Sequence, residues 1–181
     1  MANEKNICIP GIKDGETFKI GEMEFIKFPE KDGKTPVVMK NIAFRSRFGG
    51  TNNFKESDIL QRMKEEILPG IVEAIGEENL CSITTDLTSL DGLKDYGAAE
   101  SLIALPTLDF YRENAEIFQA HKLNRWWWLA TPWRTPTNDD DWCVLCVSPS
   151  GFIGSSGYFN GNNGVRPFLI FKSCIFGSPE A

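Results

Sequence analysis

A chain of 181 residues, 41% of them hydrophobic and 24% charged, is long enough for one globular domain with a sizeable core and is not typical of a disordered protein. Its formal net charge of −6 gives no general attraction to phosphate backbones, which argues against nucleic acid as a partner. The longest apolar runs are far shorter than the roughly 20 residues that a transmembrane helix needs, so no membrane insertion is expected.

The N-terminus, Met-Ala-Asn-Glu-Lys, has no apolar signal core, so we expect synthesis in the cytoplasm. Release from the cell, or display on a phage particle or cell surface, stays compatible with this start. The cysteines are odd in number, which favours free thiols over a disulfide framework. They are Cys8, Cys81, Cys143, Cys146 and Cys174.

Residues 1–55 are predicted to be rich in β-structure. The runs Thr17–Ile20 and Met23–Phe28 flank Gly21-Glu22, a pattern typical of a hairpin. Thr35–Phe44 predicts a further strand, and the Gly- and Asn-rich residues 49–53 predict a loop.

Residues 56–125 are predicted to form a helical scaffold. A first helix is expected from Ser57 or Asp58, either of which can cap it, with a kink or an end at Pro69 and an extension to Gly76. A second helix is expected after Thr107. Short strands are expected between them, at Leu80–Leu87 and Leu102–Leu105. Both helices carry apolar residues at helical spacing on one face: Ile59, Leu60, Met63, Ile67 and Leu68 in the first, and Leu108, Tyr111, Ala115 and Phe118 in the second.

Residues 126–173 change character and predict a sheet with irregular loops. Strands are expected at Trp126–Thr131, at Trp142–Val147, in a return strand starting with Phe152-Ile153, and at Val165–Phe171. A polar loop covers residues 132–141, and the Gly- and Asn-rich residues 154–164 predict turns, with Arg166 in a structural role against carboxylate or carbonyl groups.

The aromatic residues of this region separate into two groups. On a strand, Trp127 faces opposite to Trp126 and Trp128, and we expect core packing for Trp127 and at least one neighbour, with ligand stacking open for one of the three. The second group lies in or beside polar loops, where aromatic side chains suit recognition, with capping of a small core as the alternative. This group is Trp133, Trp142, Tyr158 and Phe159.

Enzyme and metal readings have little support in the sequence. Cys143 and Cys146 form a CxxC, but on a strand residues three apart point to opposite faces, so shared metal binding is not expected. His121 is the single histidine and has no nucleophile motif around it. The run Asn138–Asp141 lacks the pattern of a calcium loop and is interpreted as solvated, with an acidic ligand contact or a metal site as alternatives. We therefore expect no cofactor, no metal and no catalytic residue.

Three elements of this tail resemble one known family. Trp127–Pro132 is similar to the "WWLRSP" element of C-type lectin-like domains in bacterial and phage proteins, Val147–Gly151 to their "V-N-x-x-G" hairpin, and Gly164–Phe168 to their closing "GVRPA" strand. Gly161–Arg166 also resembles the end of the variable region in proteins diversified by retroelements. Ala130-Thr131 departs from the usual Arg-Ser, the lectin disulfides have no clear counterpart, and the Glu-Pro-Asn sugar-binding signature is absent, so calcium-dependent sugar binding is not carried over.

The resemblance implies an α+β, C-type lectin-like fold over residues 1–181, with two helices flanking a small, mostly antiparallel sheet with long irregular loops. It further implies a protein that displays a diversifiable, hypervariable recognition surface to an unknown protein or glycan receptor, as in phage receptor binding or adhesion. A structural subunit of a phage particle, with homo-oligomer or particle assembly, and a formylglycine-generating-type oxidase are the alternatives. The expected ligand-binding residues are Trp133, Arg134, Asn138, Asp140, Asp141, Trp142, Leu145, Phe152, Ser155, Ser156, Tyr158, Phe159 and Asn160.

Overall fold

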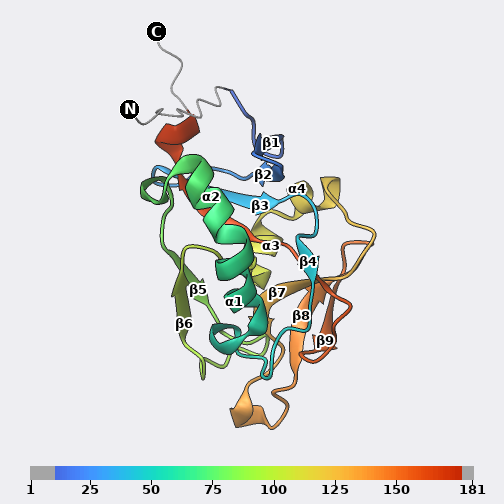
Figure 1. Ribbon diagram of the computed structural model, residues 1–181. Helices are drawn as coiled ribbons and strands as arrows, with labels where there is room; N and C mark the ends of the chain where they lie inside the picture. The colour runs from blue at the N-terminus through green and yellow to red at the C-terminus, as the bar shows by residue number, and fades with distance from the viewer. Residues whose placement is uncertain (1–10, 177–181) are drawn as a thin grey trace.

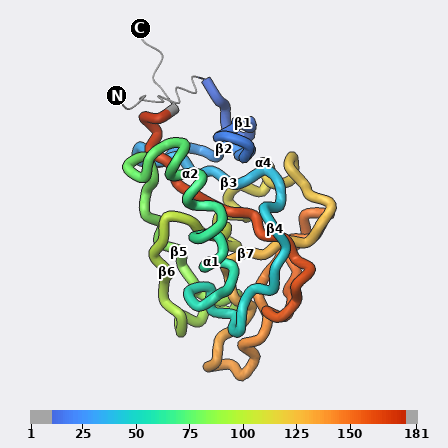
Figure 2. Tube along the Cα trace, in the orientation of Figure 1, coloured from blue at the N-terminus to red at the C-terminus, as the bar shows by residue number. Residues whose placement is uncertain are grey.

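The computed structural model describes residues 11–176 of the chain (Figures 1 and 2). In this part, eleven strands form three sheets, and the longest continuous helical segment spans residues 58–75. The expected fold, C-type lectin-like with two helices flanking a small sheet, is therefore wrong, because the chain is mostly β. Within segment 56–125, the strand expected at Leu80–Leu87 is found at Ile83–Asp86, whereas its partner strand is Ala98–Ser101 and not the expected Leu102–Leu105.

The first sheet has four antiparallel strands in the order β1-β2-β3-β11 and joins the two ends of the described chain. The predicted hairpin is confirmed, since β1 and β2 are joined through Gly21, whose φ of +57° suits a tight turn. The strands are β1 (Thr17–Ile20), β2 (Met23–Lys27), β3 (Lys34–Met39) and β11 (Phe168–Lys172).

The second sheet has five strands in the order β4-β10-β7-β8-β9. Its β10–β7 pair is parallel, whereas the other three pairs are antiparallel. The strands are β4 (Phe44–Arg45), β7 (Trp127–Pro132), β8 (Cys143–Val147), β9 (Ile153–Gly157) and β10 (Gly164–Val165). The third sheet is the antiparallel pair of β5 (Ile83–Asp86) and β6 (Ala98–Ser101).

The long helical segment consists of α1 (Asp58–Arg62), a π-helical turn (Met63–Ile67) and α2 (Leu68–Ile75), and it runs along the front of the molecule in Figure 1. Ser57 caps it, accepting a hydrogen bond from the Leu60 amide, as its sequence predicts. Pro69 does not end the helix. The Leu68 amide bonds to the Met63 carbonyl five residues back, and this wider turn accommodates a residue that has no N–H to donate.

The second predicted helix is two short pieces, α3 (Leu108–Glu113) and α4 (Ala115–Ala120). Asn114 lies between them with non-helical backbone angles, and its side chain donates to the Phe110 carbonyl. A side chain that competes for a helical carbonyl explains the break. Short 3-10 turns complete the described chain at Phe54–Glu56, Glu77–Asn79, Pro136–Asn138 and Ser173–Phe176.

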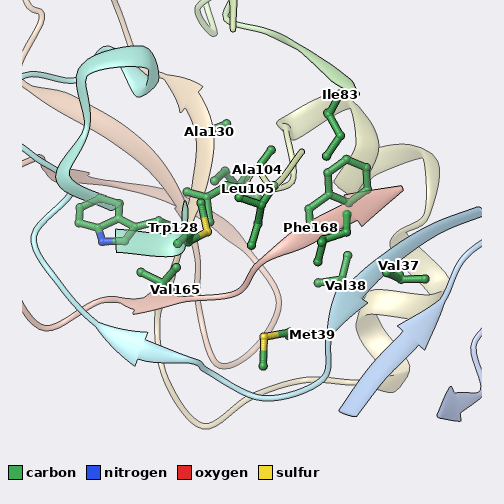
Figure 3. Close-up of a cluster of buried hydrophobic side chains, with 14 of the residues drawn as sticks. Val37, Val38, Met39, Ile83, Ala104, Leu105, Trp128, Ala130, Val165 and Phe168 are labelled. Carbon is green, nitrogen blue, oxygen red and sulfur yellow. The ribbon is translucent and has the colours of Figure 1, made fainter. Parts of the chain in front are cut away.

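One core connects the first two sheets. Val37, Val38 and Phe168 from the four-stranded sheet belong to the same cluster of buried side chains as Trp128 and Val165 from the five-stranded sheet, as Figure 3 shows. The predicted strand Val165–Phe171 crosses from one sheet to the other and is divided into β10 and β11, so it is not one strand. The division falls at Arg166 and Pro167, and proline has no N–H with which to continue a ladder.

Arg166 fixes this crossing. Its guanidinium is buried and donates to the carbonyls of Met39, Lys40 and His121, and it lies 5.2 Å from the ring of Trp127. Of the two kinds of partner that the sequence left open, the structure shows carbonyls. Burial lowers the pKa of Arg166 to about 10.

No helix in residues 11–176 is both long and apolar enough to cross a membrane.

Candidate recognition surface

Solvent-exposed aromatic side chains lie next to the ends of β8 and β9. Trp142 directly precedes β8, Phe152 directly precedes β9 and Phe159 follows β9, and these three side chains are 50%, 59% and 64% exposed. Half-buried Trp126 and Tyr158 lie beside them. We call these five residues the aromatic surface. Exposed aromatic side chains of this size, at both ends of one edge strand, are characteristic of interaction sites.

At one end of the aromatic surface, the rings of Trp142 and Phe159 stack almost in parallel, with centroids 6.3 Å apart and an interplanar angle of 8°. Tyr158 meets Phe159 edge-on, with centroids 5.7 Å apart. Gly157 makes room for this arrangement, because a Cβ there would lie 2.6 Å from the Phe159 ring. Contacts of this kind stabilise an aromatic pair by about 0.5–1.5 kcal/mol, so the rings are held in place before any ligand arrives.

A second aromatic pair marks the other end. Trp126 and Phe152 meet edge-to-face, with ring centroids 5.5 Å apart. A glycine lies beneath this pair too, since a Cβ at Gly154 would lie 2.9 Å from the Trp126 ring. The two pairs therefore lie at opposite ends of β9, a strand with little side-chain bulk, Ile-Gly-Ser-Ser-Gly. Because Gly154 and Gly157 are three residues apart on this strand, the two pairs also lie on opposite faces of it.

The frame beneath the aromatic surface is fully packed. All five residues of β8 are buried, and so are all six residues of β7. Trp127 and Trp128 belong to this frame, as predicted, and the Trp128 indole N–H donates to the Ser46 carbonyl. Leu145 was expected to point outward, and that expectation is wrong: its side chain is completely buried, because β8 lies between β7 and β9 with both of its faces covered.

The loop of residues 133–141 borders the Trp142–Phe159 pair and is tied to a second loop, residues 89–95. Asn138 donates to the Asp91 carboxylate, and the Thr137 amide donates to Asp95. The hydrogen bonds from Ser89 and then Asn138 lower the pKa of Asp91 below its usual value. The run Asn138–Asp141, with its three adjacent carboxylates, is therefore part of two loops that hydrogen bonds join.

Asn52 anchors the base of that loop. Its buried amide donates to the carbonyls of Arg134 and Cys143, 2.7 Å and 3.1 Å away, and its oxygen accepts from the Tyr96 hydroxyl. Arg134 itself is exposed and lies 3.4 Å from Asp140. The loop thus presents polar groups to solvent while its backbone is held by a side chain from the core.

The structure distributes the predicted site residues over three environments. Exposed are Arg134, Asn138, Asp141, Trp142, Phe152, Ser155 and Phe159; half-buried are Trp133, Asp140, Ser156, Tyr158 and Asn160; and buried is Leu145. Sequence reasoning left out Trp126 as a member of the surface. The alternation along the strand already placed it opposite to Trp127, and the position just before the strand could have indicated a half-exposed ring.

The cysteine pair lies within the packed frame. Cys143 and Cys146 are both buried, free thiols. Burial raises the pKa of both, to about 12 for Cys146, so neither forms a thiolate near neutral pH. Among residues 11–176, no group of three or more histidine, cysteine or acidic side chains could hold a metal ion. Cys8 falls outside the described residues.

His121 is engaged in a structural contact. Its Nε2 lies 2.7 Å from the carbonyl oxygen of Gly15, which ties the end of α4 to the start of β1. Because a carbonyl oxygen can only accept, Nε2 is the donor in this contact.

These features define a mostly β protein whose aromatic surface lies at the ends of β9, the edge strand of the five-stranded mixed sheet. The chain belongs to the family described as "Domain of unknown function (DUF6273)", whose model matches residues 80–173, just over half of the chain. The match runs from before β5 to the end of β11 and includes the whole aromatic surface. Neither a curated protein nor a solved structure matches the chain. The sequence resemblance to retroelement-diversified proteins stays a prediction, without the C-type lectin-like fold that it implied.

Proposed function

We propose that this protein is a ligand- or receptor-binding protein and that the aromatic surface, with the adjoining loop of residues 133–141, is where it binds. The observation that supports this proposal most directly is the exposure of Trp142, Phe152 and Phe159, each at least half open to solvent above a strand that is fully buried. Nothing in the packing of the described residues requires these three large apolar side chains to lie in water.

The energetic argument concerns what a partner would gain. Fully burying one large apolar side chain contributes about 1.5–3 kcal/mol to binding. Each of the three half-exposed rings could contribute a substantial part of that free energy when a partner covers it. Since the rings are already paired and β8 is packed, little conformational freedom is lost on binding. Aromatic anchors on a rigid frame, rimmed by polar Asn, Ser and Asp side chains, are typical of recognition surfaces.

Binding is favoured over catalysis by the state of the candidate reactive groups. The two thiols of β8 are buried with raised pKa values, and the imidazole of His121 is engaged with a backbone carbonyl. An oxidase mechanism would need an accessible, ionisable thiol pair.

The test is a screen of the purified chain against a glycan array and a panel of surface proteins, repeated with the variant Trp142→Ala/Phe152→Ala/Phe159→Ala. We expect the variant to lose any captured ligand by about 100-fold or more, with a small change in melting temperature. Leu90→Ser is the matched control, because Leu90 is 43% exposed and belongs to neither aromatic pair. Equal binding by the triple variant and the parent would contradict the proposal.

The resemblance to retroelement-diversified proteins further implies that exposed positions of this surface vary between copies of the gene. Arg134, Asn138, Asp141 and Ser155 project from the frame and could change without disturbing the core. A reverse-transcriptase gene near the coding region, with a near-copy of the stretch that encodes residues 126–166, would support this extension. If the locus has neither the reverse-transcriptase gene nor the near-copy, the proposal of diversification is wrong, but the proposal of binding is unaffected.

A further inference from the structure

The strand between the two aromatic pairs has one open edge. β9 is the last strand of the five-stranded sheet and pairs with β8 alone, and it lies at the margin of the molecule in Figure 1. A strand in this position presents a row of main-chain donors and acceptors on its outer side.

The hydrogen bonds at the ends of the ladder show which groups these are. The Ser148 amide donates to the Phe152 carbonyl and the Tyr158 amide donates to the Trp142 carbonyl, each at 2.9 Å. Pairs that exchange hydrogen bonds alternate with pairs that do not, so Gly154 and Ser156 bond inward to β8. The main-chain groups of Ile153, Ser155 and Gly157 consequently point outward.

Most of these outward groups have no partner within residues 11–176. The Gly157 carbonyl accepts from the Asn160 amide, but neither the N–H nor the C=O of Ile153 and Ser155 is paired. These residues lie one strand period apart, which is the spacing at which an extended chain running alongside would exchange its own hydrogen bonds.

Both ends of this edge carry apolar groups, and the loop beside its Trp142 end is acidic. β9 is about 16 Å long at the usual rise per residue, with the Trp126–Phe152 pair at one end and the Trp142–Phe159 pair at the other. Residues 133–160 contain three aspartates and a single arginine, and Arg134 is already shared between Asp91 and Asp140. A basic side chain in a ligand would therefore be attracted to the Trp142 end and could also lie over an aromatic ring.

We propose that the outer edge of β9 binds an extended, basic polypeptide segment of a partner protein, which adds a sixth strand to the sheet. This inference rests on the proposed binding function and names the class of its ligand. Main-chain hydrogen bonds to Ile153 and Ser155 supply affinity, and the two aromatic pairs select apolar and basic side chains at the ends of the segment. A second copy of the chain is less favoured as the occupant, since two chains of net charge −6 repel each other.

The probe is a display library of random linear peptides, selected on the full-length chain. The enriched peptide is synthesised, and its dissociation constant is measured by calorimetry with the parent and with Ser155→Pro. Proline removes the outward N–H at position 155 but is tolerated on edge strands, and the preceding Gly154 leaves room for its ring. We expect Ser155→Pro to weaken binding by about tenfold or more, whereas Ser155→Ala, which removes the side-chain hydroxyl but keeps the N–H, should weaken it much less.

A second measurement is independent of how the variant folds. The enriched peptide is N-methylated at one residue at a time and titrated against the unmodified protein. In a peptide that adds a strand, only alternate amides face β9. Single methylations should therefore lower the affinity at every second position and have little effect at the positions between. We expect this period-two pattern, together with enrichment of lysine and arginine in the selected peptides.

The outcomes separate this inference from the proposed function. If Trp142→Ala/Phe159→Ala abolishes peptide binding while Ser155→Pro and every N-methyl peptide behave like their parents, the surface binds ligands but not by strand addition, and the inference is overturned. A self-association that Ser155→Pro abolishes, with no peptide enriched over background, would assign the edge to a second copy and overturn it as well. Peptides that bind all of these variants equally would contradict both proposals.

Discussion

β8 and β9 are neighbours in one sheet, yet they differ in almost every physical respect. β8 lies between two strands, and its five side chains, Cys-Val-Leu-Cys-Val, are all buried. β9 pairs on one side only, consists of small residues apart from Ile153, and begins and ends next to exposed aromatic rings. The difference indicates that the packed strand fixes the geometry while the edge strand is left available for contact.

The tryptophans show the same division. Trp128 is fully buried in β7 and hydrogen-bonded to Ser46, whereas Trp142 stands just outside β8 and is half exposed. The same residue type is therefore buried where it lies within a strand and exposed where it lies beside the end of one.

The largest expected effect comes from the buried member of this comparison. Trp128→Ala removes a large side chain from a packed core and should destabilise the protein by about 3–5 kcal/mol in urea unfolding. Trp142→Ala, which leaves no internal cavity, should cost a small fraction of that. Equal losses for the two variants would mean that Trp142 also belongs to the core.

Several elements of the fold, including the strands of the packed frame, could be predicted from the sequence. Gly21-Glu22 indicated the first hairpin, Ser57 the start of the long helix, and the apolar runs the positions of β7 and β8. These features depend on local chemistry, such as turn residues, caps and side-chain periodicity, and such chemistry is visible in a short window of sequence.

The features that the sequence did not indicate depend on tertiary contacts. Gly154 and Gly157 favoured a turn, but each lies beneath an aromatic ring, and together with the pairing to β8 this gives a strand. Leu145 was expected to face solvent because strands often have one open face, whereas β8 is covered on both. Arg166 and Pro167 divide the last predicted strand between two sheets, and no local sequence pattern predicts that a chain passes from one sheet to another.

An intermediate effect is expected for the thiols of β8 at high pH. Burial raises the pKa of Cys146 to about 12 from its ordinary value of 9.0, so between these values the unfolded chain has released a proton that the folded chain still holds. The free energy of unfolding should therefore fall as pH rises through this window, by up to about 1.4 kcal/mol per pH unit.

Cys146→Ala should remove that part of the alkaline slope, as measured by urea unfolding at a series of pH values. The exposed Cys174 provides the contrast, since it should react with a thiol reagent in the folded protein while Cys143 and Cys146 stay protected. Rapid labelling of Cys146 in the native state would show that the frame is not packed as described.

The smallest effect on stability, but a clear one on binding, is expected at Gly157. A methyl group there would lie 2.6 Å from the exposed Phe159 ring, which would have to give up part of its contact with Trp142 to make room. Gly157→Ala should thus cost less than about 1 kcal/mol while disturbing the Trp142–Phe159 stack and weakening capture of the selected peptide. Gly161→Ala is the control, because a Cβ there would meet only one backbone atom, 4.0 Å away. Unchanged capture by Gly157→Ala would show that the stacked geometry is not used.

Amide hydrogen exchange followed by NMR tests the contrast between the two strands without any ligand. Along β9, Gly154 and Ser156 should exchange slowly and Ile153 and Ser155 rapidly, while Val144 and Cys146 in β8 stay protected. Protection of Ile153 and Ser155 equal to that of their neighbours would mean that the edge is already occupied, and the account of an open recognition strand on a packed frame would be wrong.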